Sequence, residues 1–378
     1  MKGDDRMEQN NYKFQDVCEI VTDYVANGSF KSLADNVQYS DKKDYARLIR
    51  LVDFNNNYDE KNAVWVPESS YNFLKKSVLH GDEVIISNVG ANLGTVFKCP
   101  KLTYPMTLGP NSLLVRTNDL CNQNYLYYYL KSKIGYSKLM ALVSGTAMPK
   151  FNKTELRNME ISLPDRAYQD NAVEVLIKID KKIELNNKIN NNLYKLIKNN
   201  YEFLINGCNW EEVELGAISN ITSGKRPVDK SETGEYPVIG ANGIMAYACD
   251  YNFNEDLIIT GRVGTLGVVK RYLGKIWASD NTLVIQTKYL NYIENYLKTI
   301  DYYSLNRGST QPLLTQGDLK KQIIYFNEES VTKFEKDNQI FVDKIRNNEK
   351  EISKLIQLRD ILLPKLMNGE IDLDNIEI

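Results

Sequence analysis

The feature that most constrains this chain is a long run, residues 170–204, that contains neither proline nor glycine. Apolar residues recur through it at helical spacing, which places them along one side of a helix. They are Leu176, Ile179, Ile183, Leu193, Ile197 and Leu204, and Asn186, Asn190 and Asn200 share the stripe. Asparagines within an apolar stripe are typical of a coiled-coil seam, where they fix the register. We therefore predict one long helix that acts as a spacer, roughly 50 Å long at about 1.5 Å per residue.

The same pattern returns near the C-terminus, over residues 338–366. Its apolar members are Phe341, Ile345, Ile352, Leu355, Leu362 and Leu366, with Asn338, Asn348 and Arg359 as polar members. A shift of 162 residues places Ile183 on Ile345, Asn186 on Asn348 and Leu193 on Leu355. Each run follows a long segment of short β-rich runs separated by turns. This order indicates a duplicated unit: globular, helix, globular, helix.

The globular segments repeat as well. A β-rich run at 82–86 corresponds to 256–260, the glycine turn 89–94 to 261–267, and the small-residue loop 144–149 to 307–312. We expect a strand at 47–53, a helix over 123–142 and a strand at 160–163 in the first unit. The prediction is an α+β protein with globular domains of mixed α/β content at 1–166 and 208–328. The helices occupy 167–207 and 329–378.

Composition excludes several classes of site. Five cysteines lie far apart without a C-x-x-C pair, and His80 is the single histidine, so we predict no metal site. A Ser–His–Asp triad would have to use His80. Neither a phosphate-cradling loop nor a dinucleotide fingerprint occurs, because the spacing of the glycine turn 261–267 differs from both. We therefore predict no catalytic residue and no cofactor in this chain.

The chain lacks the roughly 18 consecutive apolar residues of a membrane helix. Its first residues are polar and charged, unlike a secretory signal, so a cytoplasmic location is expected. The net charge of −2 is compatible with nucleic-acid binding if basic residues gather on one face or a partner neutralises phosphates.

Polar and basic residues accompany the duplicated turns. Glycine turn geometry and solvated surface explain each position taken singly, and that interpretation stays open. Together, at matching places in two repeats, such side chains are the donors that contact base edges and phosphates. The candidate DNA contacts are Arg47, Ser87, Asn88, Asn92, Lys98 and Lys150 in the first domain, and Lys225, Arg226, Asn242, Arg262, Lys270, Arg271, Arg307 and Gln311 in the second.

In order and in duplicate, these segments resemble the specificity (S) subunit of Type I restriction–modification systems. The resemblance covers nearly the whole chain. It is carried by GTAMPKFNKTEL and GSTQPLLTQGDL, by the helix starts KIDKKIE and FVDKIRN, by the ending RDILLPKLMNGEI, and by TSGKRP, YPVIGANGI and ITGRVGTLGVVKR in the second unit. The first unit departs from the second, since its strand at 47–53 and its loop at 55–62 have no match.

The resemblance implies that each globular unit is a target-recognition domain for one half of a bipartite double-stranded DNA site. The two helices would pack as an antiparallel coiled coil, set the spacer and dock two methyltransferase (M) subunits, with restriction (R) subunits joining afterwards. S-adenosylmethionine would belong to the methyltransferase. The docking residues implied are Ile183, Asn186, Leu193, Ile197, Ile345, Asn348, Leu355 and Leu362. The alternative is a scaffold or adhesion module that binds protein or glycan through the duplicated loops. A third possibility, a stand-alone enzyme, would need His80 in a pocket.

Overall fold

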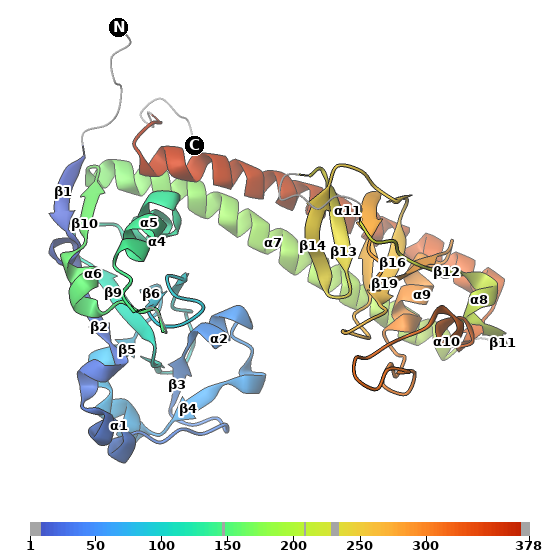
Figure 1. Cartoon of the computed structure of the whole chain (residues 1–378), viewed down its shortest axis with the longest axis horizontal. Helices are drawn as coiled ribbons and strands as arrows, with labels where there is room; N and C mark the ends of the chain where they lie inside the picture. Colours follow the sequence, from blue (N-terminus) through green and yellow to red (C-terminus); the bar gives the residue numbers. More distant parts are fainter. Residues whose placement is uncertain (1–8, 146–147, 208, 228–233, 372–378) are drawn as a thin grey trace, which may run out of the picture. The chain divides into compact units, whose positions relative to one another are not determined.

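The computed structural model describes residues 9–145, 148–207, 209–227 and 234–371 (Figure 1). It divides into two compact units. The first contains the chain up to Lys182 together with the segment from Lys354 onward, and the second contains Ile183–Ser353. The division therefore falls inside both long helices rather than at their ends.

The two long helices are α7 (Arg166–Ile205) and α11 (Glu328–Met367), each 40 residues in length. In the second unit, Asn348 Nδ2 donates to Asn190 Oδ1 at 2.7 Å, and Asn200 Nδ2 donates to Asn338 Oδ1 at 2.9 Å. Asn190 of α7 thus pairs with the later residue of α11 and Asn200 with the earlier one, so the helices run antiparallel. The asparagine stripe predicted from the sequence is confirmed as the seam between them.

The first unit contains two four-stranded sheets. Strands β2 (Cys18–Asp23), β9 (Ser112–Thr117), β6 (Val84–Ser87) and β7 (Val96–Lys98) form one, in that order and antiparallel. Strands β4 (Val64–Val66), β3 (Ala46–Ile49), β8 (Met106–Leu108) and β5 (Val78–Leu79) form the other, in which β3 and β8 run parallel. A separate ladder joins β1 (Asn10–Lys13) to β10 (Glu160–Leu163). The helices are α1 (Phe30–Asn36), α2 (Leu51–Asn55), α3 (Glu68–Phe73), α4 (Gln123–Lys131), α5 (Lys133–Ala141) and α6 (Lys153–Asn158).

The second unit repeats this topology strand for strand. Its first sheet has the order β12 (Asn220–Ser223), β19 (Thr282–Gln286), β16 (Leu257–Gly261) and β17 (Lys270–Tyr272). Its second has β14 (Gly243–Ala248), β13 (Tyr236–Gly240), β18 (Lys275–Ala278) and β15 (Phe253–Asn254), with β13 and β18 parallel. A ladder joins β11 (Glu211–Glu214) to β20 (Ile323–Phe326), and the helices are α8 (Leu215–Ile218), α9 (Leu290–Leu297) and α10 (Gln316–Lys320). The predicted duplication is thereby confirmed. The expectation that the strand at 47–53 has no match is wrong, because β13 pairs with β14 and β18 just as β3 pairs with β4 and β8.

Each unit has a core that joins a sheet, a short helix and the long helices. In the second unit this core includes Ile258 of β16, Ile293 of α9, Ile197 of α7 and Ile345 of α11. In the first unit the corresponding core combines Val84 of β6 with residues of α4, α7 and α11. Burial of one such side chain is worth about 1.5–3 kcal/mol. The long helices are therefore part of each unit's hydrophobic core.

Two predicted elements are corrected. The strand expected at 47–53 ends at Ile49, because Asp53 accepts hydrogen bonds from the backbone nitrogen and side chain of Arg50 and starts α2. The helix expected over 123–142 is broken at Ser132, whose hydroxyl accepts from the Gly135 nitrogen and caps α5. Gly135 is required there, since a Cβ would lie 2.1 Å from the Tyr129 carbonyl oxygen.

Candidate nucleic-acid interface

Five loops of the second unit meet at one side of its sheets, here called the second loop edge: residues 224–227, 241–242, 261–270, 279–281 and 307–313. Backbone hydrogen bonds hold the glycine turn 261–267 between the loop 279–281 and the segment that starts at 307. Arg262 N donates to Asn281 O at 2.8 Å, and Leu314 N donates to Arg262 O at 2.8 Å. Gly264 N donates to Pro312 O at 2.9 Å. The turn is thus fixed by its own backbone. The half-buried Arg262 side chain in addition donates through Nη1 to Asp280 O at 3.1 Å, on the same edge.

Most of the predicted second-domain contacts lie on this edge. Lys225 N donates to Ala278 O at 2.9 Å, next to the exposed Arg226. Lys270 Nζ donates to Asn242 O at 3.3 Å, which brings the β13–β14 turn beside the glycine turn. The second loop edge therefore gathers cationic and amide side chains from separate parts of the sequence: Lys225, Arg226, Asn242, Arg262, Lys270 and Gln311.

The remaining basic candidate on this edge, Arg307, is held by a carboxylate. Its Nη2 lies 2.9 Å from Asp318 Oδ1, and its side chain is 67% exposed. The guanidinium, through its hydrogen bond, lowers the pKa of Asp318. Because exposed ion pairs are weak, this pair leaves Arg307 able to exchange Asp318 for a phosphate.

The first unit builds the same junction at matching positions, here called the first loop edge: residues 87–95, 109–112, 144–145 and 148–152. Asn88 N donates to Asn111 O at 3.2 Å, Gly90 N to Pro149 O at 3.1 Å, and Phe151 N to Asn88 O at 3.2 Å. These three bonds correspond one by one to those of the second unit. Asn88 and Arg262 therefore occupy equivalent positions.

A hollow lies beside the first loop edge. It is lined by polar residues of that edge and by the aromatic side chains of Tyr24, Phe30 and Tyr39. Phe30 is 84% exposed and Tyr39 is 53% exposed. The polar lining residues are Asn88, Asn111, Ser112, Ser144, Lys150 and Asn152. The predicted candidates Asn92 and Lys150 are both exposed on the first loop edge, and Lys150 also lines the hollow.

Two first-domain candidates are corrected because they are buried. Arg47 is fully buried (0% exposed), and its guanidinium donates to the carbonyl oxygens of Tyr58 and Asp59 at 2.9 and 3.0 Å. It also lies 3.6 Å from Asp53. Ser87 is 3% exposed. Both residues serve the interior of the domain and cannot reach DNA.

Lys98 and Arg271 are also corrected, because they point away from the loop edges. Lys98 Nζ donates to Asn124 Oδ1 of α4, and Arg271 Nη2 donates to Asn291 Oδ1 of α9 at 2.9 Å. Burial lowers the pKa of Lys98, while the charges of Asp82 and Asp180 oppose the shift. The side chain of Arg271 is 9% exposed. Each cation faces the helix that packs beneath its sheet.

The predicted docking residues lie in the helix seam instead of on an open surface. Asn186, Ile197, Ile345 and Asn348 are nearly fully buried. Asn186 Nδ2 donates to Glu351 Oε2 at 2.8 Å. Ile183, Leu193, Leu355 and Leu362 are half-buried. These residues hold the helices together, so the assignment of the buried ones to partner docking is wrong.

The sequence interpretation missed a second stripe on α7. Leu185, Leu196 and Phe203 are 52%, 40% and 84% exposed, and Ile189 is half-buried. Steps of four, seven and seven residues place all four on one side of the helix, away from the seam. Those steps are visible in the sequence and could have revealed this exposed apolar stripe.

Other candidate chemistry is sparse in the described part of the chain. His80 is exposed, and its backbone nitrogen donates to Glu83. Among these residues, none form a His, Cys, Asp or Glu cluster able to hold a metal ion. Within the same ranges, every helix is too short or too polar to cross a membrane. Cys208, and Thr146 and Ala147 of the small-residue loop, lie outside the described residues.

Comparison with known proteins decides the family. Residues 8–195 and 208–351 match the family model described as Type I restriction modification DNA specificity domain. This chain belongs to that family. It is a Type I specificity subunit with two DNA-recognition domains, as the resemblance predicted.

A curated relative and a solved structure agree with this assignment. The Type I restriction enzyme MjaIX specificity subunit of Methanocaldococcus jannaschii is 26% identical over 321 residues, which cover 72% of this chain and 74% of the relative. The crystal structure of a Type I restriction–modification S subunit from M. genitalium covers 97% of this chain and 98% of its own, with a TM-score of 0.62 and 17% identity. At that identity the structural match supports the fold alone.

Proposed function

We propose that this specificity subunit recognises a bipartite site in double-stranded DNA, with one half contacted by each loop edge. The observation that carries the proposal is the shared backbone junction that places Asn88 and Arg262 at equivalent positions. Arginine is the side chain that most often recognises guanine in the major groove. The Asn88 side chain donates through Nδ2 to Phe151 O at 2.9 Å, so the exposed Asn92 and Lys150 are the donors that the first loop edge offers to DNA. The two domains would thus present different recognition groups on one scaffold.

The side chains around Arg262 carry positive charge, which matches the negative phosphates of DNA. Lys225, Arg226 and Lys270 are exposed on the second loop edge, where they can contact phosphates and fix the register of the domain on the duplex. Phosphate contacts release counterions, so this part of the affinity should fall with added salt. The chain's net charge of −2 is compatible with this proposal if partner subunits supply further phosphate contacts.

The long helices are proposed to set the distance between half-sites. A helix of 40 residues is about 60 Å long at about 1.5 Å per residue. One turn of duplex is about 34–36 Å. Linking two weak binding units on a stiff spacer converts them into one specific binder through effective concentration.

Two methyltransferase subunits and the restriction subunits are the proposed protein partners. Leu185, Leu196 and Phe203 are exposed along one side of α7, with the half-buried Ile189 between them, and an exposed apolar patch of this kind marks a protein-interaction site. Catalysis, and the S-adenosylmethionine that it consumes, would then belong to the methyltransferase, and the complex would act in the cytoplasm.

Replacing Arg262 with alanine is expected to weaken binding to cognate DNA by about 1–3 kcal/mol, because one base contact is lost. Binding to a scrambled duplex should change much less. Competition titrations at one fixed salt concentration measure both. Arg307→Ala, which removes a cation already bound to Asp318, is the matched control and should alter sequence preference least. An equal loss on both duplexes would show that Arg262 contacts a phosphate.

Replacing both Leu196 and Phe203 with aspartate is expected to weaken methyltransferase binding by about 2 kcal/mol or more, since charges would enter an apolar interface. The thermal unfolding midpoint of the isolated subunit should stay unchanged, because both side chains are exposed. The double variant Asn187→Asp/Asn191→Asp introduces the same two charges at exposed positions on another face of α7 and serves as the control. Undiminished assembly of the double variant would exclude this stripe as the docking surface.

A further inference from the structure

Lys98 and Arg271 occupy equivalent places in the two units. Lys98 of β7 pairs with Val84 of β6, and Arg271 of β17 pairs with Ile258 of β16. Val84 and Ile258 pair in turn with the matching strands β9 and β19. The two cations therefore stand at the same point of the outer strand of corresponding sheets.

Each cation is bound by the same part of the helix that follows its sheet. The acceptors Asn124 and Asn291 are both the second residue of their helices, α4 and α9. Tyr127 follows Asn124 by three residues, and the centroid of its ring lies 4.6 Å from Lys98 Nζ. Arg271 Nη2 lies 2.8 Å from Glu294 Oε2 at the corresponding position. The partner chemistry differs, but the contact between strand and helix is conserved between the two repeats.

The short helices are themselves held by the long ones. In the first unit, Asn122 N, at the start of α4, donates to Gln169 Oε1 of α7 at 2.8 Å. In the second unit, the backbone nitrogens of Asn291 and Tyr292 donate to Glu335 of α11 at 3.1 and 2.8 Å. A continuous set of contacts thus runs from sheet to cation, from cation to short helix, and from short helix to long helix.

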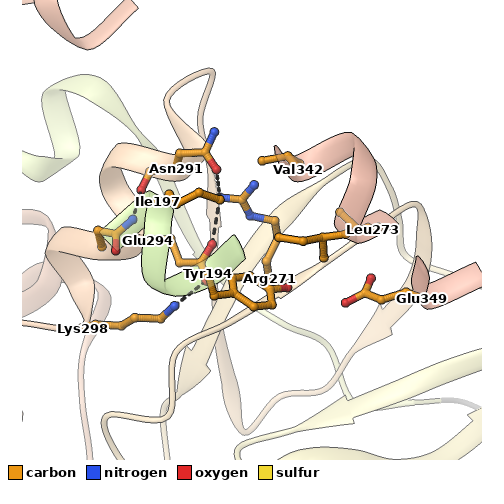
Figure 2. Close-up of a pocket in the computed structure, with 11 residues that line it drawn as sticks. Tyr194, Ile197, Arg271, Leu273, Asn291, Glu294, Lys298, Val342 and Glu349 are labelled. Atoms are coloured by element: carbon orange, nitrogen blue, oxygen red, sulfur yellow. Dashed lines mark hydrogen bonds and ion pairs between the residues drawn. The ribbon is translucent and has the colours of Figure 1, made fainter. Parts of the chain in front are cut away.

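The contact in the second unit is desolvated. Arg271 and Glu294 are 9% and 7% exposed, and both line a cavity with Tyr194, Lys298 and Glu349 (Figure 2). Figure 2 shows the Arg271 guanidinium directed toward α9, within the unit. A buried ion pair of this kind requires one particular geometry, and removal of one partner is costly. Its burial leaves little of either charged group on the surface of the unit.

We propose that Lys98 and Arg271 are positioning residues, which fix the orientation of each recognition sheet on the long helices. This inference rests on the proposed bipartite recognition. If the loop edges are to meet two half-sites at once, each sheet must be held at one angle on its helix. A sheet that can tilt would reach half-sites at several separations.

The test uses the subunit assembled with its methyltransferase and a series of duplexes whose half-sites are separated by the optimal spacer or by one or two base pairs more or fewer. The measured quantity is spacer selectivity, the ratio of affinity for the optimal spacer to that for its neighbours. Arg271→Met is expected to lower this ratio about tenfold, because the effective concentration of the second domain at its half-site depends on geometry. Arg271→Lys should restore it, since the first unit uses lysine at this position.

Asn124→Ala provides a second variant, which removes the hydrogen-bond acceptor of Lys98. It tests the positioning role by itself if Arg271→Met fails to assemble. It should lower spacer selectivity in the same direction. Lys288→Met is the matched control, because Lys288 forms an exposed pair with Glu328 of α11. Selectivity equal to wild type in folded complexes of Arg271→Met and Asn124→Ala, even with weaker binding to every duplex, would overturn the inference. A wild-type complex without bipartite preference would overturn the proposed function instead.

Discussion

Replacing Arg47 with methionine is expected to destabilise the first unit by about 3 kcal/mol, the low end of the cost of breaking a buried ion pair. Arg47 is fully buried, and its guanidinium is the donor to the carbonyl oxygens of Tyr58 and Asp59. Methionine fills similar space but leaves both oxygens without that donor. The cost stays near the low end because Asp53 keeps its contact with Arg50, at 2.9 Å. Urea unfolding of the full chain, followed by hydrogen exchange in the first unit, measures the effect.

Arg47→Lys should recover little of the lost stability, because one ammonium cannot reproduce the planar fork of a guanidinium. Lys101→Met is the control: Lys101 forms an exposed pair with Asp82, and its loss should leave unfolding unchanged. If the Arg47→Met protein is as stable as wild type but no longer binds cognate DNA, Arg47 contacts DNA and its structural role is contradicted.

Replacing Asn348 with leucine is expected to destabilise the second unit by about 1–3 kcal/mol, the cost of a buried polar group without its partner. Asn348 and Asn190 are 1% and 6% exposed, and they share one hydrogen bond in the helix seam. The double variant Asn190→Leu/Asn348→Leu should regain most of this stability, because both polar groups are then gone. It should lose register specificity, which the asparagines supply.

A double-mutant cycle in urea separates these effects. Asn192→Leu, at an exposed position on α7, controls for the added apolar surface. Strictly additive losses for the two seam variants would mean that Asn190 and Asn348 do not stabilise one another, and would contradict the seam as described.

The parts of the fold that repetition encodes could be predicted from the sequence. The stripes on α7 and α11 have helical periodicity over many turns, so their existence and polar seam members were predictable. The duplicated glycine turns marked the two loop edges, because turns at matching places in a repeat fold in the same way. Asn88, Asn92, Lys150, Arg262 and their neighbours were therefore found on those edges, and their contacts with DNA stay predictions.

The errors arose where tertiary contacts override local pattern. Arg47 lies in a β-rich run, and the carbonyls that bind it belong to a turn in which Asn57 and Tyr58 have φ of 51° and 58°. The asparagines at 55–57 indicate a loop, but the sequence does not show that the carbonyl oxygens of this loop bind the guanidinium of Arg47. Arg271 illustrates a second cause, since its direction depends on which side of a sheet α9 covers. The seam residues were assigned to partners because a single sequence does not say whether a stripe meets another helix of the same chain or a different subunit.

The most direct test of the central claim is single-molecule methylation sequencing of host DNA with and without this gene, expressed together with its candidate methyltransferase. The account predicts a bipartite, adenine-methylated motif that is present only with the gene. Within that motif, Arg262→Ala should relax the sequence of one half-site alone. A methylation pattern that is unchanged by removal of the gene, in cells where the methyltransferase is active, would contradict the account.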